Sequence, residues 1–405
     1  MHLFGTKMAK TTATTKSTTM RTGVLPSQAI QMMLRDGDIL PAEKCCGIEP
    51  DQLQPASIDL RLGYYAYPVE ASFLPGPGAS VMGKLLKMDP DIERFKVDLR
   101  EGGVLEKGKV YVVPLLEAIR LKHDIAAVAN PKSSTGRLDI LTRLITDEAS
   151  HFDQVRAGYT GRLYVEVAPR SFSVIARTGT RLNQLRFRRT CGLTSRAIST
   201  AQWRELIEKG QIVADKNAGK KERLCENPGL LPFTVDLMAE AREGGIIGWR
   251  AKKSTARIDL ERRDYDPFEF FEPLRFRKNS ALALVPDEFY ILMTREAIAV
   301  PPAFAAEMLP YETRAGEFRV HYAGFFDPGF GWNSATNSAG TSRGVLEVRS
   351  HEVSFLLEHE QAIGWLRYER MADVPALLYG QEVKSNYQGQ ALRLAKQFKD
   401  PSVTG

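Results

Sequence analysis

Residues Ser27 to Ile39 read SQAIQMMLRDGDI, and residues Ala201 to Ile212 read AQWRELIEKGQI. Each stretch has apolar residues at helical spacing, then a glycine suited to end a helix, then the apolar start of a strand. Both are followed by a Pro-led segment that carries an aspartate, PASIDLRLG in the first case and PFTVDLMAE in the second. The chain therefore repeats one unit.

Four markers recur in the same order: the glycine after the helix, this aspartate, the glutamate of an EAI triplet, and a glutamate within a VEV or LEV strand. The separations are 173, 177, 179 and 181 residues for the pairs Gly37 and Gly210, Asp59 and Asp236, Glu117 and Glu296, and Glu166 and Glu347. Slowly growing separations in a fixed order predict two homologous domains. We expect a disordered leader over residues 1–22, domains over 23–189 and 193–378, and a C-terminal tail over 379–405.

After each leading helix the sequence contains short β-rich runs separated by Gly, Pro, Asn and Asp. KVYVVPLLEAIRL and GRLYVEVAP belong to the first half, and EFRVHYAGFF and RGVLEVRS belong to the second. Long helical periodicity is missing after the first helix of each half. The pattern predicts a mainly β fold, with one barrel or jelly roll per half and a leading α-helix in each.

Composition narrows the class of protein. The 405 residues are 43% hydrophobic and 26% charged, with a formal net charge of +6 and four cysteines, values typical of a soluble globular protein. No apolar run is long enough to span a membrane. With few cysteines and no C-x-x-C motif, neither a disulfide scaffold nor a zinc finger is expected, and a reducing cytoplasm is the simpler location.

The only dense cluster of cations comprises four arginines, Arg181, Arg186, Arg188 and Arg189. A duplex-binding protein usually concentrates its positive charge on one face, whereas this charge is otherwise spread thinly. We therefore interpret the cluster as a solvated strand edge and expect no nucleic-acid partner.

The octapeptide NPKSSTGR, from Asn130 to Arg137, combines turn formers with two hydroxyls and two cations. Such a turn can gather hydroxyl, backbone N–H and cationic groups around an anion. Alone, the octapeptide fits a surface turn equally well, so its meaning depends on the neighbouring motifs.

Together the motifs resemble, in order, the signature segments of the dCTP deaminase and dUTPase superfamily. The segments are QPASIDLRLG (54–63), PKSSTGR (131–137), RTGTRLNQLRF (177–187), HYAGFFDPGFG (321–331), GVLEV (344–348) and KSNYQGQ (384–390). The resemblance covers nearly the whole chain after the leader, as two family domains in tandem. It implies hydrolytic deamination of dCTP to dUTP and ammonia, in pyrimidine deoxynucleotide biosynthesis.

The resemblance also implies roles for individual residues. Ser133 would position the attacking water, Arg137 would support the site electrostatically, and either Glu166 or Glu347 would move protons. Substrate-binding residues would be Lys132, Ser134, Gln184, Asp327, Phe330, Lys384, Tyr387 and Gln390. The zinc-deaminase signature H-x-E with P-C-x-x-C is absent from the sequence, so we expect a metal-free Glu mechanism, with Mg²⁺ bound only through the substrate triphosphate.

Each half departs from the family pattern in a different place. Arg156 occupies the position of the D-P-G aspartate in the first half, and YETRAG (311–316) replaces the serine turn in the second. The first half thus keeps the serine-containing turn PKSSTGR (131–137). The second half keeps HYAGFFDPGFG (321–331), which resembles the hairpin that holds the base and the sugar in the family. Because family sites form between neighbouring barrels, we expect one composite site: Ser133, Ser134, Arg137 and Gln184 from the first domain, with Asp327, Phe330 and Glu347 from the second.

Glu166 stays an alternative catalytic carboxylate. It follows Arg156 by 10 positions, near the family spacing, whereas Glu347 follows Asp327 by 20. A threefold ring, moreover, cannot alternate two domain types evenly. Other functions also stay open: a dUTP diphosphatase, a bifunctional deaminase and diphosphatase, or a nucleotide-binding regulator without turnover. The resemblance implies a homo-oligomer with trimer-like barrel packing, and dUTP or dTTP as product or inhibitor.

Overall fold

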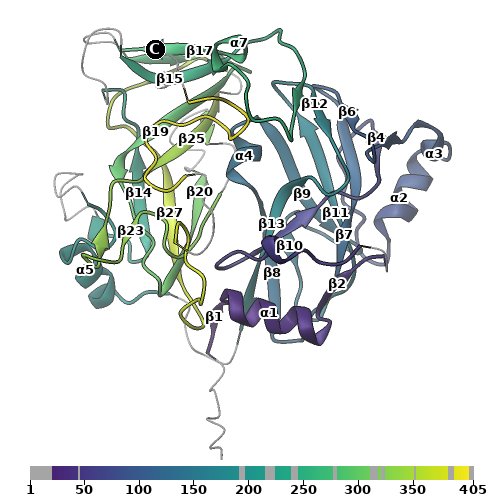
Figure 1. Ribbon diagram of the computed structural model, residues 1–405, viewed down its shortest axis with the longest axis horizontal. Helices are drawn as coiled ribbons and strands as arrows, with labels where there is room; N and C mark the ends of the chain where they lie inside the picture. Colours follow the sequence, from purple (N-terminus) through teal and green to yellow (C-terminus); the bar gives the residue numbers. More distant parts are fainter. Residues whose placement is uncertain are drawn as a thin grey trace, which may run out of the picture.

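Two groups of β-sheets lie side by side, the first half of the chain in one and most of the second half in the other (Figure 1). The computed structural model describes residues 21–43, 46–190, 197–214, 224–238, 245–276, 281–310, 318–320, 324–350, 353–381 and 387–400. The mainly β fold predicted from the sequence is confirmed.

The first half folds into two large sheets and one small one. The first sheet joins β1 (Gly23–Val24), β13 (Arg181–Arg189), β8 (Ile125–Pro131) and β10 (Gln154–Val155), with β3 (Ile58–Arg61) beside β13. The second joins β5 (Val97–Asp98), β4 (Tyr65–Val69), β7 (Val110–Arg120), β11 (Thr160–Pro169) and β9 (Ile140–Thr146), with β2 (Ile39–Pro41) beside β7. The small sheet joins β6 (Gly103–Leu105), β12 (Val174–Ala176) and β16 (Ile258–Asp259), which comes from the second half.

The second half repeats this strand order. One sheet joins β14 (Leu230–Thr234), β27 (Ala362–Arg370), β20 (Phe304–Pro310) and β22 (Phe325–Phe326), matching β3-β13-β8-β10. The other joins β17 (Phe271–Arg275), β15 (Ile246–Ala251), β19 (Phe289–Ala297), β25 (Arg343–Ser350) and β21 (Phe318–Val320), matching β5-β4-β7-β11-β9. Two small two-stranded sheets complete the second half. One joins β18 (Leu282–Leu284) and β26 (Phe355–Leu357), and the other joins β23 (Trp332–Asn333) and β24 (Ser338–Ala339). The repeat seen in the sequence is thus also a repeat in sheet topology, while the predicted domain limits stay predictions.

The expected helix lies near the start of each half, as α1 (Ser27–Asp36) in the first and α5 (Thr200–Glu208) in the second. Gly37 ends α1 with a φ of 75°, a left-handed conformation that glycine adopts at little cost. The short elements are η1 (Pro50–Gln52), α4 (Ser133–Gly136) and α7 (Pro267–Phe270).

Two further helices, α2 (Val81–Met88) and α3 (Ile92–Phe95), lie at the outer edge of the first half (Figure 1). The sequence pattern, which lacks long helical periodicity after the leading helix, did not predict these two short helices. Ser80 caps α2 by accepting a hydrogen bond from the Gly83 amide at 3.1 Å. With Leu85 and Ile92, this insertion covers an apolar cluster on the outer face of the second sheet.

The halves share an ionic and apolar junction. Arg188 lies 2.6 Å from Glu369 and 2.9 Å from Glu307, and Arg349 is ion-paired with the buried Asp139. The interpretation of the arginine cluster as a solvated strand edge was therefore wrong for Arg188, which is 9% exposed, and for the fully buried Arg186. Their face of β13 is covered by the second half, which a single strand pattern cannot reveal.

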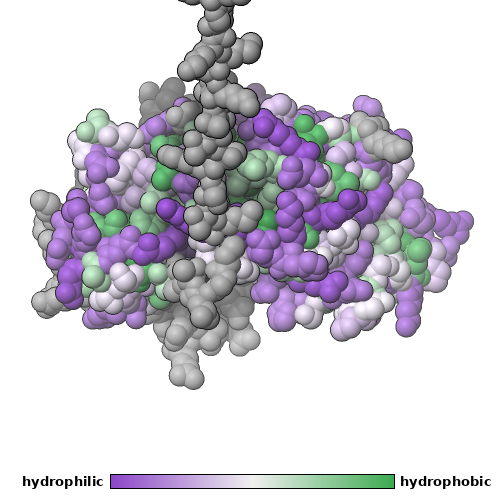
Figure 2. Space-filling view, turned by 90° about the horizontal axis from the view of Figure 1, so that it is seen from below, coloured by the Kyte–Doolittle hydropathy of each residue, from purple (hydrophilic) through white to green (hydrophobic). Residues whose placement is uncertain are grey.

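The surface seen from below is a mosaic of hydrophilic and hydrophobic residues (Figure 2). Among the residues that the structure describes, no helix is long and apolar enough to cross a membrane.

Candidate functional site

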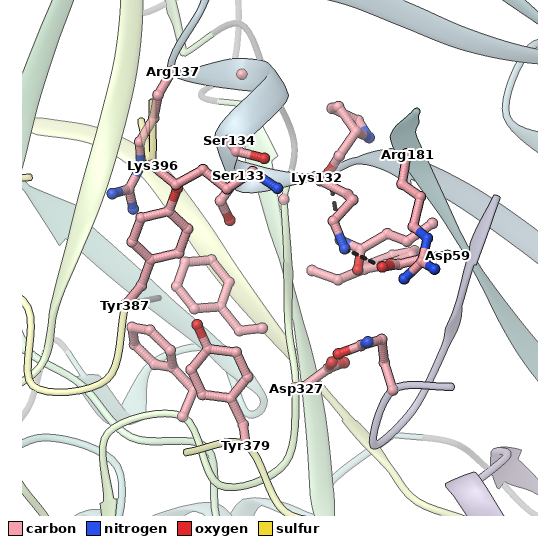
Figure 3. Close-up of a pocket in the computed structure, with 18 of the residues that line it drawn as sticks. Asp59, Lys132, Ser133, Ser134, Arg137, Arg181, Asp327, Tyr379, Tyr387 and Lys396 are labelled. Atoms are coloured by element: carbon pink, nitrogen blue, oxygen red, sulfur yellow. Dashed lines mark hydrogen bonds and ion pairs between the residues drawn. The ribbon is translucent and has the colours of Figure 1, made fainter. Parts of the chain in front are cut away.

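A cavity of about 650 Å³ lies at the junction and takes its walls from both halves and from the tail (Figure 3). The predicted residues that line it are Lys132, Ser133, Ser134, Arg137, Gln184, Asp327, Phe330, Glu347, Tyr387 and Gln390. The structure thus brings together both halves of the expected composite site, although the role of each residue stays a prediction. Lys384 lies outside the described residues.

The serine turn projects from the end of β8. Pro131 ends the strand, Lys132 is extended, and residues Ser133 to Gly136 form the single turn α4. Two bonds fasten this turn to Leu182 of the neighbouring strand: its carbonyl accepts from the Lys132 amide and from the Thr135 hydroxyl, both at 2.8 Å. With Thr135 anchored in this way, the side chains of Ser133 and Ser134 are left to line the cavity.

Lys132, Asp59 and Arg181 form one wall of the cavity (Figure 3). Lys132 and Asp59 are ion-paired, and Asp59 Oδ1 is buried without a partner among the described residues. Arg181 contacts Asp51 at 2.7 Å, and its hydrogen bond lowers the pKa of that carboxyl. Sequence reasoning missed Asp59 and Arg181 as site residues, although both lie in motifs that carried the resemblance.

Arg137 and Glu347 meet at the opposite wall, where Arg137 Nε lies 3.9 Å from Glu347 Oε1. Arg137 also donates to the Gln390 side chain at 2.9 Å and to the Arg393 carbonyl at 3.0 Å, and it stacks 3.9 Å above the Tyr387 ring. These contacts hold the guanidinium in one orientation.

Glu347 is 4% exposed. Burial raises the pKa of this carboxyl to about 7, and the nearby charge of Arg137 opposes the shift. A carboxyl that titrates near neutrality can both accept and release a proton, which is the property needed by a general acid and base.

The tail crosses the cavity and is fastened to the start of β25. The Arg343 amide donates to the Gln390 carbonyl at 3.0 Å, and the Gly389 amide donates to Ser342 Oγ at 2.9 Å. Lys396 of the tail also lines the cavity and was not predicted. Burial, together with the charges of Lys132 and Arg263, lowers the pKa of Lys396 to about 8, so this wall is suited to an anion.

The hairpin after β22 supplies Asp327 and an aromatic group. The Phe330 ring packs edge-on against Phe326, with centroids 5.0 Å apart, and lies 5.7 Å from Tyr379. Gly331 permits the tight return of the chain, since its φ is 61° and a Cβ there would lie 2.0 Å from the Ile298 carbonyl oxygen. The hairpin presents a flat apolar surface beside one carboxylate, a combination suited to a base and a sugar.

Glu166, the alternative carboxylate, does not line this cavity. It is 1% exposed and lies 2.5 Å from Arg143, which in turn stacks 3.9 Å above Phe152 and donates to Ser72 at 2.7 Å. The second-half turn that would face an equivalent site, residues 311–316, lies outside the described residues. The described part of the chain contains no group of three His, Cys, Asp or Glu residues suited to hold a metal ion.

Comparison with known proteins agrees with this architecture. Residues 21–191 match the model of the 2′-deoxycytidine 5′-triphosphate deaminase N-terminal domain, and residues 199–398 match that of the C-terminal domain. A crystal structure of 2′-deoxycytidine 5′-triphosphate deaminase from Agrobacterium tumefaciens is 46% identical, covers 87% of this chain and 99% of its own, and superposes with a TM-score of 0.76.

Curated relatives match a shorter part of the chain. A "dCTP deaminase, dUMP-forming" of Bifidobacterium longum is 32% identical over 143 residues, which are 34% of this chain and 68% of the relative. A dCTP deaminase of Halorubrum lacusprofundi is 26% identical over 208 residues, 49% of this chain and 93% of its own. Since models of both domains match in tandem and almost all of a solved relative is covered, this chain belongs to the dCTP deaminase family.

Proposed function

We propose that the chain deaminates dCTP hydrolytically to dUTP and ammonia in the cavity between its two halves. The observation that carries the proposal is the buried Glu347, with a pKa of about 7, 3.9 Å from Arg137 in a cavity also lined by Ser133. Membership of the family supports the substrate and the reaction.

In the proposed mechanism Ser133 holds the attacking water and the Glu347 carboxylate accepts its proton as the water oxygen bonds to C4. Glu347 passes that proton to ring N3. The second proton of the added hydroxyl then moves through Glu347 to the amine, the C4–N4 bond breaks, and ammonia leaves as the C4 carbonyl forms. Arg137, whose guanidinium is fixed by three other contacts, stabilises the charge that develops during these steps.

We assign the triphosphate to the cationic side of the cavity, where Lys132, Ser134, Gln184 and Lys396 line it. Tyr387 and Gln390 hold the tail against Arg137, and Lys384 stays a predicted phosphate ligand. In this proposal Mg²⁺ reaches the site bound to the phosphates of the substrate. Asp51 and Asp59, which also line the cavity, are the carboxylates that would lie beside a phosphate-bound Mg²⁺.

Asp327 and Phe330 would bind the nucleoside. Glu166 has a structural role in this proposal, because Arg143 neutralises it outside the cavity. The expected trimer-like homo-oligomer stays a prediction that sedimentation equilibrium can test.

The decisive experiment measures ammonia release from dCTP with the purified chain and Mg²⁺. Binding of dCTP without ammonia would refute the deaminase proposal and favour a nucleotide-binding regulator. Chromatography of the nucleotide product distinguishes dUTP from dUMP. The dUMP-forming relatives make the bifunctional reaction the second candidate, whereas a plain dUTP diphosphatase would act on dUTP alone. Inhibition by dTTP is tested in the same assay.

A further inference from the structure

Strand β13 divides its side chains between two environments. Leu185 and Phe187 are fully buried in the core of the first half, whereas Gln184, Arg186 and Arg188 alternate with them and face the second half. Alternation is the normal consequence of strand geometry. One face of one strand therefore supplies a cavity residue and two interdomain arginines.

Arg186 is the most deeply buried of these residues, with no exposed surface. Its Nη2 lies 2.9 Å from Asp327 Oδ1 and 3.4 Å from the Phe326 carbonyl oxygen, and its Nη1 lies 2.9 Å from the Ala306 carbonyl oxygen. The guanidinium stacks 3.9 Å from the centre of the Phe325 ring. Arg186 of the first half therefore contacts two strands of the second half, β20 and β22, and also the aspartate that follows β22.

These contacts suit arginine in particular. A planar guanidinium can satisfy a carboxylate and two carbonyls at once while stacking on a ring, whereas the compact ammonium of lysine cannot. A charge buried this deeply is costly unless its partners are in place. The carboxylate that it pairs with, Asp327, lines the cavity beside Phe330.

We propose that Arg186 is a positioning residue: it orients Asp327 to accept a hydrogen bond from a sugar hydroxyl of the bound nucleotide. This inference rests on the proposed function of the cavity. It goes beyond that function because it makes the first half set the nucleoside-binding geometry of the second. Arg186 would do so from within β13, although among the described residues this strand itself lines the cavity only with Arg181 and Gln184.

The test is a double-mutant cycle with Arg186→Met, Asp327→Asn and the double variant, assayed with dCTP and 2′,3′-dideoxy-CTP. We expect either single variant to raise KM for dCTP about tenfold with kcat within about threefold, and the double variant to raise it no further, because both changes remove one interaction. All three should lose the preference for dCTP over the dideoxy compound.

Arg188→Met is the matched control, since Arg188 lies on the same face and forms interdomain ion pairs without lining the cavity. It should lower thermal stability but leave KM for dCTP within about twofold. Additive effects in the cycle, or an equal rise of KM in Arg188→Met, would overturn the inference, because both would indicate general loosening of the junction.

Two measurements keep the test independent of folding and of turnover. Arg186→Lys keeps the charge and should raise KM about fivefold, so a wild-type KM and nucleoside preference in this variant would also overturn the inference. Calorimetric titration with dCTP gives affinity directly: absence of ammonia from the wild type refutes the proposed function, whereas unchanged affinity in the Arg186 variants refutes the positioning role.

Discussion

Glu347→Gln and Glu166→Gln make the same chemical change at equivalent places, the middle of β25 and the middle of β11. The two surroundings differ in kind. Glu347 lies in the cavity 3.9 Å from an arginine, and Glu166 lies outside it, 2.5 Å from Arg143. We therefore expect the two substitutions to change stability in opposite directions, and only Glu347→Gln to lower activity strongly.

The effect on stability follows from the pKa of Glu347, which burial raises from 4.5 to about 7. Below pH 4.5 the carboxyl is protonated in both the folded and the unfolded chain, so Gln changes the free energy of unfolding little. Between pH 4.5 and 7 the unfolded chain loses this proton while the folded chain keeps it, so the wild type loses stability as pH rises. Above pH 7 the loss is complete and amounts to about 3 kcal/mol.

Glu347→Gln should therefore be more stable than the wild type by up to about 3 kcal/mol at pH 8, and by almost nothing at pH 4. Glu166→Gln should be less stable, by about 1–3 kcal/mol, because it leaves Arg143 without its charged partner in a largely buried place. Arg143 is 30% exposed, which keeps this loss below that of a fully buried pair.

The effect on activity follows from the proposed proton transfers. Glu347→Gln should lower kcat by about 10²–10⁴, the usual contribution of a general acid or base, while dCTP still binds. In the wild type, kcat/KM should fall as pH drops below about 7, because the protonated carboxyl cannot accept a proton from water. Glu166→Gln should keep kcat within about threefold.

The assay combines urea unfolding at pH 4 and pH 8 with ammonia release and calorimetric binding of dCTP, for the wild type and both variants. If Glu347→Gln is no more stable than the wild type at pH 8, the desolvation argument is refuted. Loss of kcat in Glu166→Gln alone would refute the composite site and place catalysis among first-half barrels.

Three further predictions use the same activity assay. Lys396→Met should raise KM for dCTP about tenfold, and KM of the wild type, but not of this variant, should rise with pH above about 8 as Lys396 loses its charge; a flat wild-type profile would contradict its contact with phosphate. Ser133→Ala should lower kcat at least about tenfold, whereas Ser134→Ala should act mainly on KM, and equal effects would contradict the water-positioning role. EDTA should slow the reaction and Mg²⁺ restore it, while a zinc-selective chelator leaves the rate unchanged; inhibition by that chelator would contradict the metal-free mechanism.

Much of the fold could be predicted because the internal repeat is visible as short sequence patterns. The leading helices, the strand-rich halves and the four paired markers all depend on residues close in sequence. Complementary losses in the two halves likewise predicted which motifs meet, and Ser133, Arg137 and Glu347 do line one cavity. Local motifs were enough to predict the composition of the cavity, because the first half keeps the serine turn but lacks the hairpin aspartate, and the second half has the reverse.

What could not be predicted depends on packing between segments far apart in the chain. From the sequence alone, Arg186 is expected to be exposed, because its burial depends on contacts with Ala306 of β20 and with Asp327 after β22. Lys396 belongs to the site only because the tail crosses back over the cavity. Asp59 was visible as a repeat marker, but its ion pair with Lys132 joins β3 to the residue between β8 and α4, which lies far away in the sequence. Helix α2 was missed because eight residues give too little periodicity to stand out.

The composite cavity has a consequence for how the protein behaves on dilution. Its serine wall, its carboxylate and its closing tail all belong to a single polypeptide. Where such walls come from separate chains, each site exists only as long as the chains stay associated, and activity per molecule falls at low concentration. Covalent linkage turns that encounter into an intramolecular one with a high effective concentration. Specific activity should consequently stay constant from micromolar to picomolar protein.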